Sequence, residues 1–69
     1  MKEATMICDR NGNELYFTFD TVGACQRWCI ENNIDGSNDE YIAEGTYDEE
    51  NKEFNAYNYT TIDNDAWRD

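Results

Sequence analysis

In the stretch EATMICDRNGNELYFTFD, residues 3–20, apolar residues stand at every second position on both sides of Asn11-Gly12. This pattern constrains the fold more than any other feature of the chain. Asn-Gly is the strongest short signal for a β-hairpin, because both central residues of a type I′ turn need positive φ. A two-residue turn predicts three apolar cross-strand pairs on one face: Cys8 with Leu15, Met6 with Phe17 and Ala4 with Phe19. The other face then pairs Ile7 with Tyr16, Thr5 with Thr18 and Glu3 with Asp20.

Residues 22–32, VGACQRWCIEN, are predicted to form one short helix. At 100° per residue, one broad apolar stripe collects Val22, Ala24, Cys25, Trp28 and Cys29. Asp20 or Thr21 is expected to cap the first turn by accepting a backbone N–H bond. Asn32 and Asn33 tolerate the left-handed conformation in which helices end.

Residues 40–47 and 54–62 predict a second hairpin, with its turn within the segment DEENKE. An even loop of two or four residues pairs Tyr47 with Phe54, Gly45 with Ala56, Ala43 with Asn58 and Tyr41 with Thr60, and Ile62 continues that face. The opposite face then carries Glu40, Ile42, Glu44 and Thr46 with Asn55, Tyr57, Tyr59 and Thr61. A three-residue loop would change these partners.

The order β-β-α-β-β indicates a single α+β domain spanning residues 1–69, a four-stranded antiparallel sheet with one helix packed on one face. The predicted core beneath the helix comprises Met6, Cys8, Leu15, Phe17, Phe19, Val22, Cys25, Trp28, Cys29, Tyr41, Tyr47 and Phe54. The open face is expected to show Ile7, Tyr16, Ile42, Tyr57 and Tyr59, and Trp67 to fold back onto a sheet edge. Disorder, which high charge favours, is opposed by ten aromatic residues, the absence of proline and the clean alternation.

Negative charge is concentrated in the second half of the chain. The net charge is −11, of which residues 1–38 carry −3 and residues 39–69 carry −8. Nucleic-acid binding requires a basic footprint, and anionic lipid is repelled in the same way, so direct binding to nucleic acid or membrane is excluded. Such a charge attracts basic protein surfaces and cations.

Three cysteines and no histidine limit the metal and redox chemistry of the chain. An odd count disfavours a closed disulfide framework, and without a signal-peptide stretch we expect a reduced, cytoplasmic setting. Cys25 and Cys29 are expected on one helical face, with Cys8 on the sheet face that meets it. Burial as small apolar groups is favoured over a zinc or redox site, and no metal or cofactor is expected.

The sequence argues against two further kinds of site, a calcium loop and an enzyme active site. Asp9, Asn11, Asn13 and Asp20 match EF-hand positions one, three, five and twelve, but Glu14 stands where the sharp turn needs glycine. Sixteen acids make carboxylate pairs inevitable, yet so small a body leaves little room for the concave pocket of an active site. We therefore expect no enzyme.

The acids and tyrosines of the second half predict a partner-binding surface. Alternate residues of a strand recur about every 6.6 Å, roughly half the charge density of one DNA strand, which carries one charge per about 3.4 Å. Acids of neighbouring strands, of the turn and of the tail must therefore add to the array. The candidate residues are Asp39, Glu40, Glu44, Asp48, Glu49, Glu50, Glu53, Tyr57, Tyr59, Asp63 and Asp65. The alternative is an acidic face that only keeps the protein in solution.

With NDEYIAEGTYDEENKEF and DNDAWRD as its acidic segments, the chain resembles the small, acidic, phage-encoded DNA-mimic inhibitors, in particular anti-CRISPR proteins. The resemblance lies in size, charge and a compact sheet with one helix, and it rests on no shared motif. It implies a non-enzymatic inhibitor that occupies the DNA-binding cleft of a Cas effector. The alternatives are an antirestriction-type DNA mimic, an acidic adaptor for another basic protein, or a small cation-binding domain.

Overall fold

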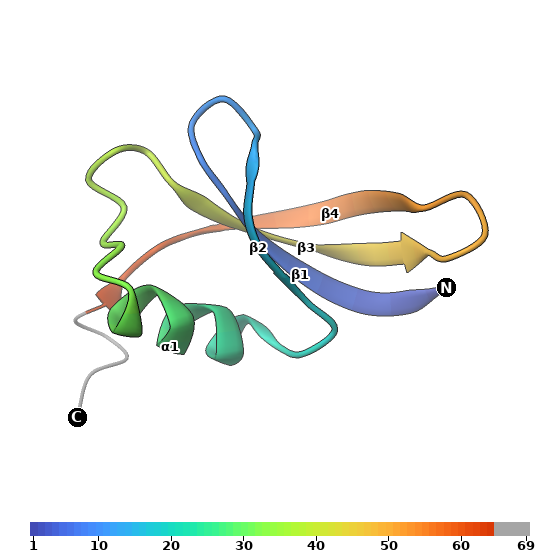
Figure 1. Cartoon of the computed structure of the whole chain (residues 1–69), viewed down its shortest axis with the longest axis horizontal. Coiled ribbons are helices and arrows are strands. Elements are labelled where there is room, and N and C mark those ends of the chain that lie inside the picture. Colours follow the sequence, from blue (N-terminus) through green and yellow to red (C-terminus); the bar gives the residue numbers. More distant parts are fainter. Residues whose placement is uncertain (65–69) are drawn as a thin grey trace.

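Two hairpins and one helix make up the regular structure of residues 1–64, the part of the chain that the computed structural model describes. The elements in chain order are β1 (Lys2–Cys8), β2 (Glu14–Thr18), α1 (Val22–Glu31), β3 (Tyr41–Asp48) and β4 (Glu53–Thr61). The predicted α+β order β-β-α-β-β is confirmed, with one helix beside a four-stranded antiparallel sheet (Figure 1). The predictions for Asp65 and Trp67 fall outside the described residues.

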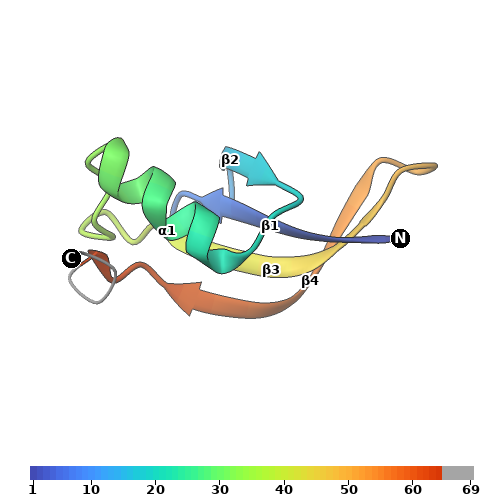
Figure 2. The same cartoon turned by 90° about the horizontal axis from the view of Figure 1, so that it is seen from below.

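The first strand of each hairpin lies at the centre of the sheet, because the strand order is β2-β1-β3-β4. β1 and β3 are antiparallel, with Ile7 opposite Ile42 and Thr5 opposite Glu44. β2 therefore runs parallel to β3 with β1 between them, and α1 is the crossover that joins the two (Figure 2). Crossovers between parallel strands are right-handed in nearly all proteins, so the strand order determines which face of the sheet the helix covers.

The first hairpin has the predicted strands but not the predicted turn. Met6 faces Phe17, as expected, whereas Cys8 faces Glu14 rather than Leu15, because the register shifts between Ile7 and Cys8. Of the Asn-Gly pair, Gly12 has positive φ, at 84°, and Asn11 does not, so the turn is not type I′.

A five-residue loop, residues 9–13, takes the place of that turn and is organised by the carboxylate of Asp9. This carboxylate accepts the backbone N–H of Asn11 and of Asn13, each at 2.9 Å, and the side-chain amide of Asn13 at 3.2 Å. The Asn13 and Asn11 bonds hold the pKa of Asp9 below its usual value. Asp9 is thus a turn residue rather than the first ligand of an EF-hand loop.

The second hairpin turns through a four-residue loop, one of the two even lengths expected. Tyr47 faces Phe54 and Gly45 faces Ala56, as predicted. A bulge between Glu44 and Gly45 then shifts the register, so the other two pairs differ from the prediction: Ala43 faces Tyr59 and Tyr41 faces Thr61. A bulge places two residues of one strand opposite one residue of its partner strand. The pattern of apolar and polar residues in the sequence does not predict it.

The helix is short and depends on the sheet for its stability. Thr21 occupies the N-cap position without a side-chain capping bond, and Asp20 accepts the N–H of Thr21 rather than one of the first turn, so neither expected cap is formed. Asn33 has φ of 59° and ends the helix in the left-handed conformation, as predicted. Within residues 1–64, no helix is long and apolar enough to cross a membrane.

The structure corrects the predicted core, because α1 covers the opposite face of the sheet. The buried centre is formed by Ile7, Cys25, Cys29, Ile42 and Ile62, with Tyr16, Val22, Trp28 and Ile34 packed around it. The helix residues of this core were predicted, but Ile7, Tyr16 and Ile42 were expected on the open face. The predicted core residues that alternate with them along the strands lie on the other face: Met6, Cys8, Phe17, Tyr41, Tyr47 and Phe54.

Candidate partner-binding surface

The predicted partner-binding residues do not form one continuous array. Asp39, Glu40 and Asp63 lie at the end of the sheet where β3 begins and β4 ends, whereas four others lie on the β3–β4 turn: Asp48, Glu49, Glu50 and Glu53 (Figure 1). Seven residue steps along β3, at about 3.3 Å each, separate these two ends by about 23 Å. Glu44 and Tyr57 lie between the ends, on the side of the sheet that α1 covers.

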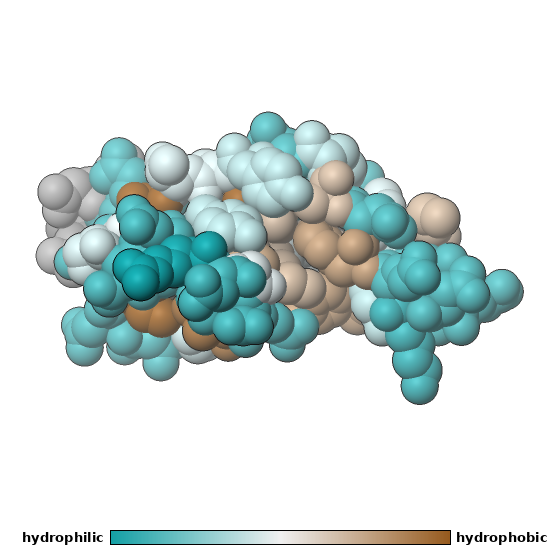
Figure 3. Space-filling view, turned by 90° about the horizontal axis from the view of Figure 1, so that it is seen from above, coloured by the Kyte–Doolittle hydropathy of each residue, from teal (hydrophilic) through white to brown (hydrophobic). Residues whose placement is uncertain are grey.

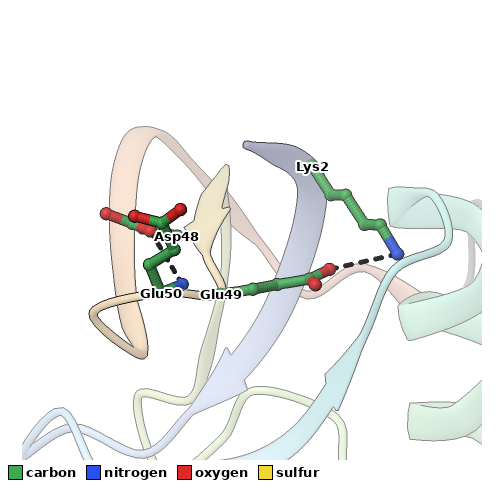
Figure 4. Close-up of polar contacts among 4 residues, drawn as sticks. All are labelled: Lys2, Asp48, Glu49 and Glu50. Carbon is green, nitrogen blue, oxygen red and sulfur yellow. Dashed lines mark hydrogen bonds and ion pairs between the residues drawn. The ribbon is translucent and has the colours of Figure 1, made fainter.

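Residues 48–53, which we call the acidic turn, are held rigid by the first of their acids. The carboxylate of Asp48 accepts the backbone N–H of Glu50 at 3.0 Å (Figure 4). It also accepts the backbone N–H of Asn51 at 3.3 Å and the side-chain amide of Asn51 at 2.7 Å. The Asn51 bonds, the side-chain bond foremost, hold the pKa of Asp48 below its usual value. This internal bonding leaves Glu49, Glu50 and Glu53 exposed at the surface of a fixed turn.

Lys2 contacts both the acidic turn and an aromatic ring. Its Nζ lies 3.1 Å from Glu49 Oε1 (Figure 4) and 5.3 Å from the centroid of the Phe19 ring. Both side chains of the ion pair remain more than half exposed, at 65% and 57%. A hollow of about 450 Å³ lies beside this contact, lined by Met1, Lys2, Asp48, Glu49 and Glu50.

Five apolar side chains gather on the side of the sheet away from α1, and we call them the aromatic face: Met6, Phe17, Phe19, Tyr47 and Phe54. The ring of Phe17 meets the rings of Phe19 and Tyr47 edge to face, each at 5.2 Å between centroids. With Glu14 and Lys52 they line a groove of about 390 Å³. Figure 3 shows the apolar patch beside the hydrophilic turn end of the molecule.

The aromatic face is adjacent to the acidic turn. Tyr47 and Phe54 are cross-strand partners, and the next pair along the hairpin is Asp48 with Glu53. Sequence reasoning missed this surface because it assigned the same aromatic residues to the core. The pairing of Tyr47 with Phe54 was predicted, so the strand order was the information that was lacking.

A second, smaller groove lies between β1, β3, β4 and the start of α1. We call it the acidic groove, because Glu3, Asp20 and Glu44 line its volume of about 290 Å³ together with Tyr57. The hydroxyl of Tyr57 donates to Glu3 Oε2 at 2.6 Å, and this bond to a carboxylate raises the pKa of the tyrosine. Glu44 in turn accepts the side-chain amide of Asn58 at 3.1 Å.

The acidic groove brings two of the predicted residues together and separates two others. Glu44 and Tyr57 share it with Glu3 and Asp20, which sequence reasoning did not select, since only the β1–β3 pairing places Glu3 beside Glu44. Tyr59 was predicted to share a face with Tyr57. It instead meets Tyr41 edge to face at 5.7 Å, because the bulge changes the alternation between the two tyrosines.

The cysteines are buried thiols, in agreement with the prediction that they pack. Burial raises the pKa of all three, that of Cys29 to about 11. Cys25 donates to the hydroxyl of Thr5 at 3.3 Å within the core. Cys8 alternates with Ile7 along β1 and lies opposite Tyr41 of β3 on the open side, so it does not meet the helix as expected. Within residues 1–64, no three side chains of His, Cys, Asp or Glu are grouped to hold a metal.

Comparison with protein-family models, with curated proteins and with solved structures finds no match to this chain. Its function must therefore be inferred from the charge and geometry of its own residues.

Proposed function

We propose that this protein is a non-enzymatic inhibitor that mimics the charge of double-stranded DNA and occupies the DNA-binding cleft of a CRISPR-Cas effector complex. Its place of action would be the cytoplasm of a bacterial host. The observation that carries the proposal is the display of carboxylates on a fixed framework. Among residues 1–64 no carboxylate is buried. The whole chain has sixteen acidic residues and only five basic ones.

The framework matters because a flexible acidic tail would lose conformational freedom on binding, whereas a preorganised array loses little. Asp48 holds the acidic turn through three hydrogen bonds. Glu3 and Glu44 are diagonal neighbours on adjacent strands, which places their Cα atoms about 7–8 Å apart. Carboxylates on neighbouring strands thus raise the charge density above that of one strand, as an imitation of a phosphate backbone requires.

Competition with DNA is the experiment that tests the proposal. Guide-loaded effectors of several CRISPR types are incubated with a fluorescent duplex target, and its binding is followed by anisotropy as the protein is added. We expect the protein to displace the duplex from at least one effector, excess duplex to reverse the effect, and binding of the protein to weaken as salt rises. A complex in which the effector holds duplex and protein together would contradict mimicry.

A type II restriction endonuclease in the same assay distinguishes the closest alternative. Displacement of DNA from the endonuclease but from none of the effectors would identify an antirestriction-type mimic. Binding to a basic protein without any displacement of DNA would identify an acidic adaptor instead. Both outcomes overturn the assignment to a Cas effector.

A further inference from the structure

One face of the sheet is rich in large apolar side chains and is covered by no element of residues 1–64 (Figure 3). Phe19 is half exposed, and the four rings of the aromatic face pack edge to face around a groove. Large contiguous apolar patches rimmed by polar residues are typical of interaction sites. Aromatic residues and methionine are also enriched where proteins meet.

The charges at the edge of this face indicate which kind of partner fits it. Lys2 Nζ lies over the ring of Phe19 and beside the carboxylate of Glu49. An aromatic ring together with a carboxylate is a favourable environment for a lysine or arginine side chain. The chain thus holds one of its own five bases in a position that suits a cation from another protein.

We propose that the aromatic face and the acidic turn together form the contact surface for a partner protein, whose matching surface carries arginine or lysine beside apolar side chains. In the free protein Lys2 occupies the position that a partner cation takes in the complex. The inference rests on the proposed function, which supplies the basic partner. It adds which face of the protein binds the partner. It also adds an apolar component of the contact, which phosphate mimicry by itself does not require.

A second copy of the chain fits this face poorly. Each copy has a net charge of −11, and a symmetric contact through the aromatic face would bring two acidic turns to the same interface. Like charges brought together in this way destabilise an interface. A basic partner, by contrast, gains attraction from the same acids.

Titration with a designed peptide, followed by amide chemical shifts in NMR, tests the assignment of the face. The probe is acetyl-(Arg-Leu)3-amide, and acetyl-(Arg-Gly)3-amide of equal charge is the control. We expect the Arg-Leu peptide to shift the amides of Lys2, Phe17, Phe19, Tyr47 and Phe54, and the Arg-Gly peptide to bind at least about threefold more weakly. Largest shifts around the acidic groove or at residues 35–40 would overturn the inference, as would equal binding of the two peptides.

Two variants with the same change in charge test the role of Lys2. Lys2→Gln and Arg27→Gln each remove one positive charge, and Arg27 is an exposed residue of α1, away from the aromatic face. Loss of a cation–π contact at an exposed site corresponds to about a two- to fivefold change in binding. We therefore expect Lys2→Gln to raise the affinity for the Arg-Leu peptide by about that factor more than Arg27→Gln does. An equal effect of the two variants would overturn the inference that Lys2 occupies the position of the partner cation.

Sedimentation of the free protein supplies the remaining test. A monomer over the concentration range of the titration is expected, whereas a dimer whose contact is abolished by Phe19→Glu would show that a second copy covers the face and would overturn the inference. The outcomes are separable from those of the DNA competition. The protein can displace DNA through another of its surfaces, and it can bind the Arg-Leu peptide here without displacing DNA from any effector.

Discussion

Ile7 and Ile42 face each other across β1 and β3, and neither side chain is exposed to solvent. This pair lies at the centre of the sheet and joins the two hairpins beneath α1. A chain of this length buries only about 60% of its unfolded surface, so loss of apolar contacts at this fully buried pair should lower its stability.

We expect Ile42→Val to lower the free energy of unfolding by about 0.5–1.5 kcal/mol and Ile42→Ala by about 2–5 kcal/mol, since a cavity adds to the lost burial. Met6→Ala, on the open and partly exposed face, is the control and should cost less than Ile42→Ala. Urea unfolding followed by tryptophan fluorescence measures all three. A larger loss for Met6→Ala would indicate that the helix covers the other face.

Gly45 lies at the bulge in the β3–β4 pairing, and its Cα is closely approached by the backbone of β4. A Cβ at this position would collide with the carbonyl oxygen of Asn55 and lie 2.8 Å from the Cα of Ala56. Because these are backbone atoms that cannot swing aside, Gly45→Ala is expected to cost about 1–3 kcal/mol, as overpacking does. Gly23→Ala, within α1, is the control and should be neutral or stabilising. Thermal unfolding of the two variants would contradict this view if Gly45→Ala were the more stable.

Cys29 should make the stability of the fold fall at alkaline pH. Burial raises the pKa of its thiol from 9.0 to about 11, so the folded state binds a proton that the unfolded state releases. The contribution is complete below pH 9 and is lost as the pH rises through about 11. This difference in pKa between the folded and unfolded states corresponds to a change in the free energy of unfolding of the order of 2 kcal/mol.

Urea unfolding at pH 8, 9, 10 and 11 measures this dependence, with Cys29→Ala as the comparison. Every other ionisable group is present in both proteins, so only the difference between the two curves reports on Cys29. We expect the variant to lose less stability than the wild type over this range. Parallel curves would show that the thiol does not titrate differently in the two states.

Charge reversal on the acidic turn should weaken binding to the effector whose DNA binding the protein blocks. Glu50→Lys and Glu31→Lys both change the net charge by +2, and both side chains are exposed. An exposed ion pair contributes about 0.2–1 kcal/mol, and reversal replaces attraction by repulsion of similar size. Glu50→Lys should therefore bind about 2- to 30-fold more weakly, and Glu31→Lys should bind nearly as the wild type does. Equal losses would show that total charge, rather than the acidic turn, decides binding.

Local structure was predictable where short-range chemistry decides it. The hairpins, the helix and the left-handed Asn33 followed from alternation, apolar spacing and the tolerance of asparagine for positive φ. The first turn was predicted wrongly because the Asp9 carboxylate offers its own hydrogen bonds to the loop. Such a competing bond is visible in the sequence only as an aspartate near a turn.

The candidate site was predictable as a set of acids but not as a surface. The residues of the acidic turn were named from the sequence, since the exposed turn of a hairpin does not depend on which face is buried. The aromatic face was assigned to the core instead. Glu44 and Tyr57 were predicted on one face, but only the β1–β3 pairing brings Glu3 into the same groove.

The amino-acid sequence by itself determined the order of the elements, part of the hairpin pairing and the concentration of negative charge in the second half of the chain. Only the tertiary structure decided that β1 pairs with β3, and with that pairing which face α1 covers. Both faces of the sheet carry large apolar side chains, so hydrophobic burial alone did not distinguish them. The crossover between two parallel strands has a preferred hand, and this geometry placed Ile7 and Ile42 in the core and left the aromatic face open beside the acidic turn.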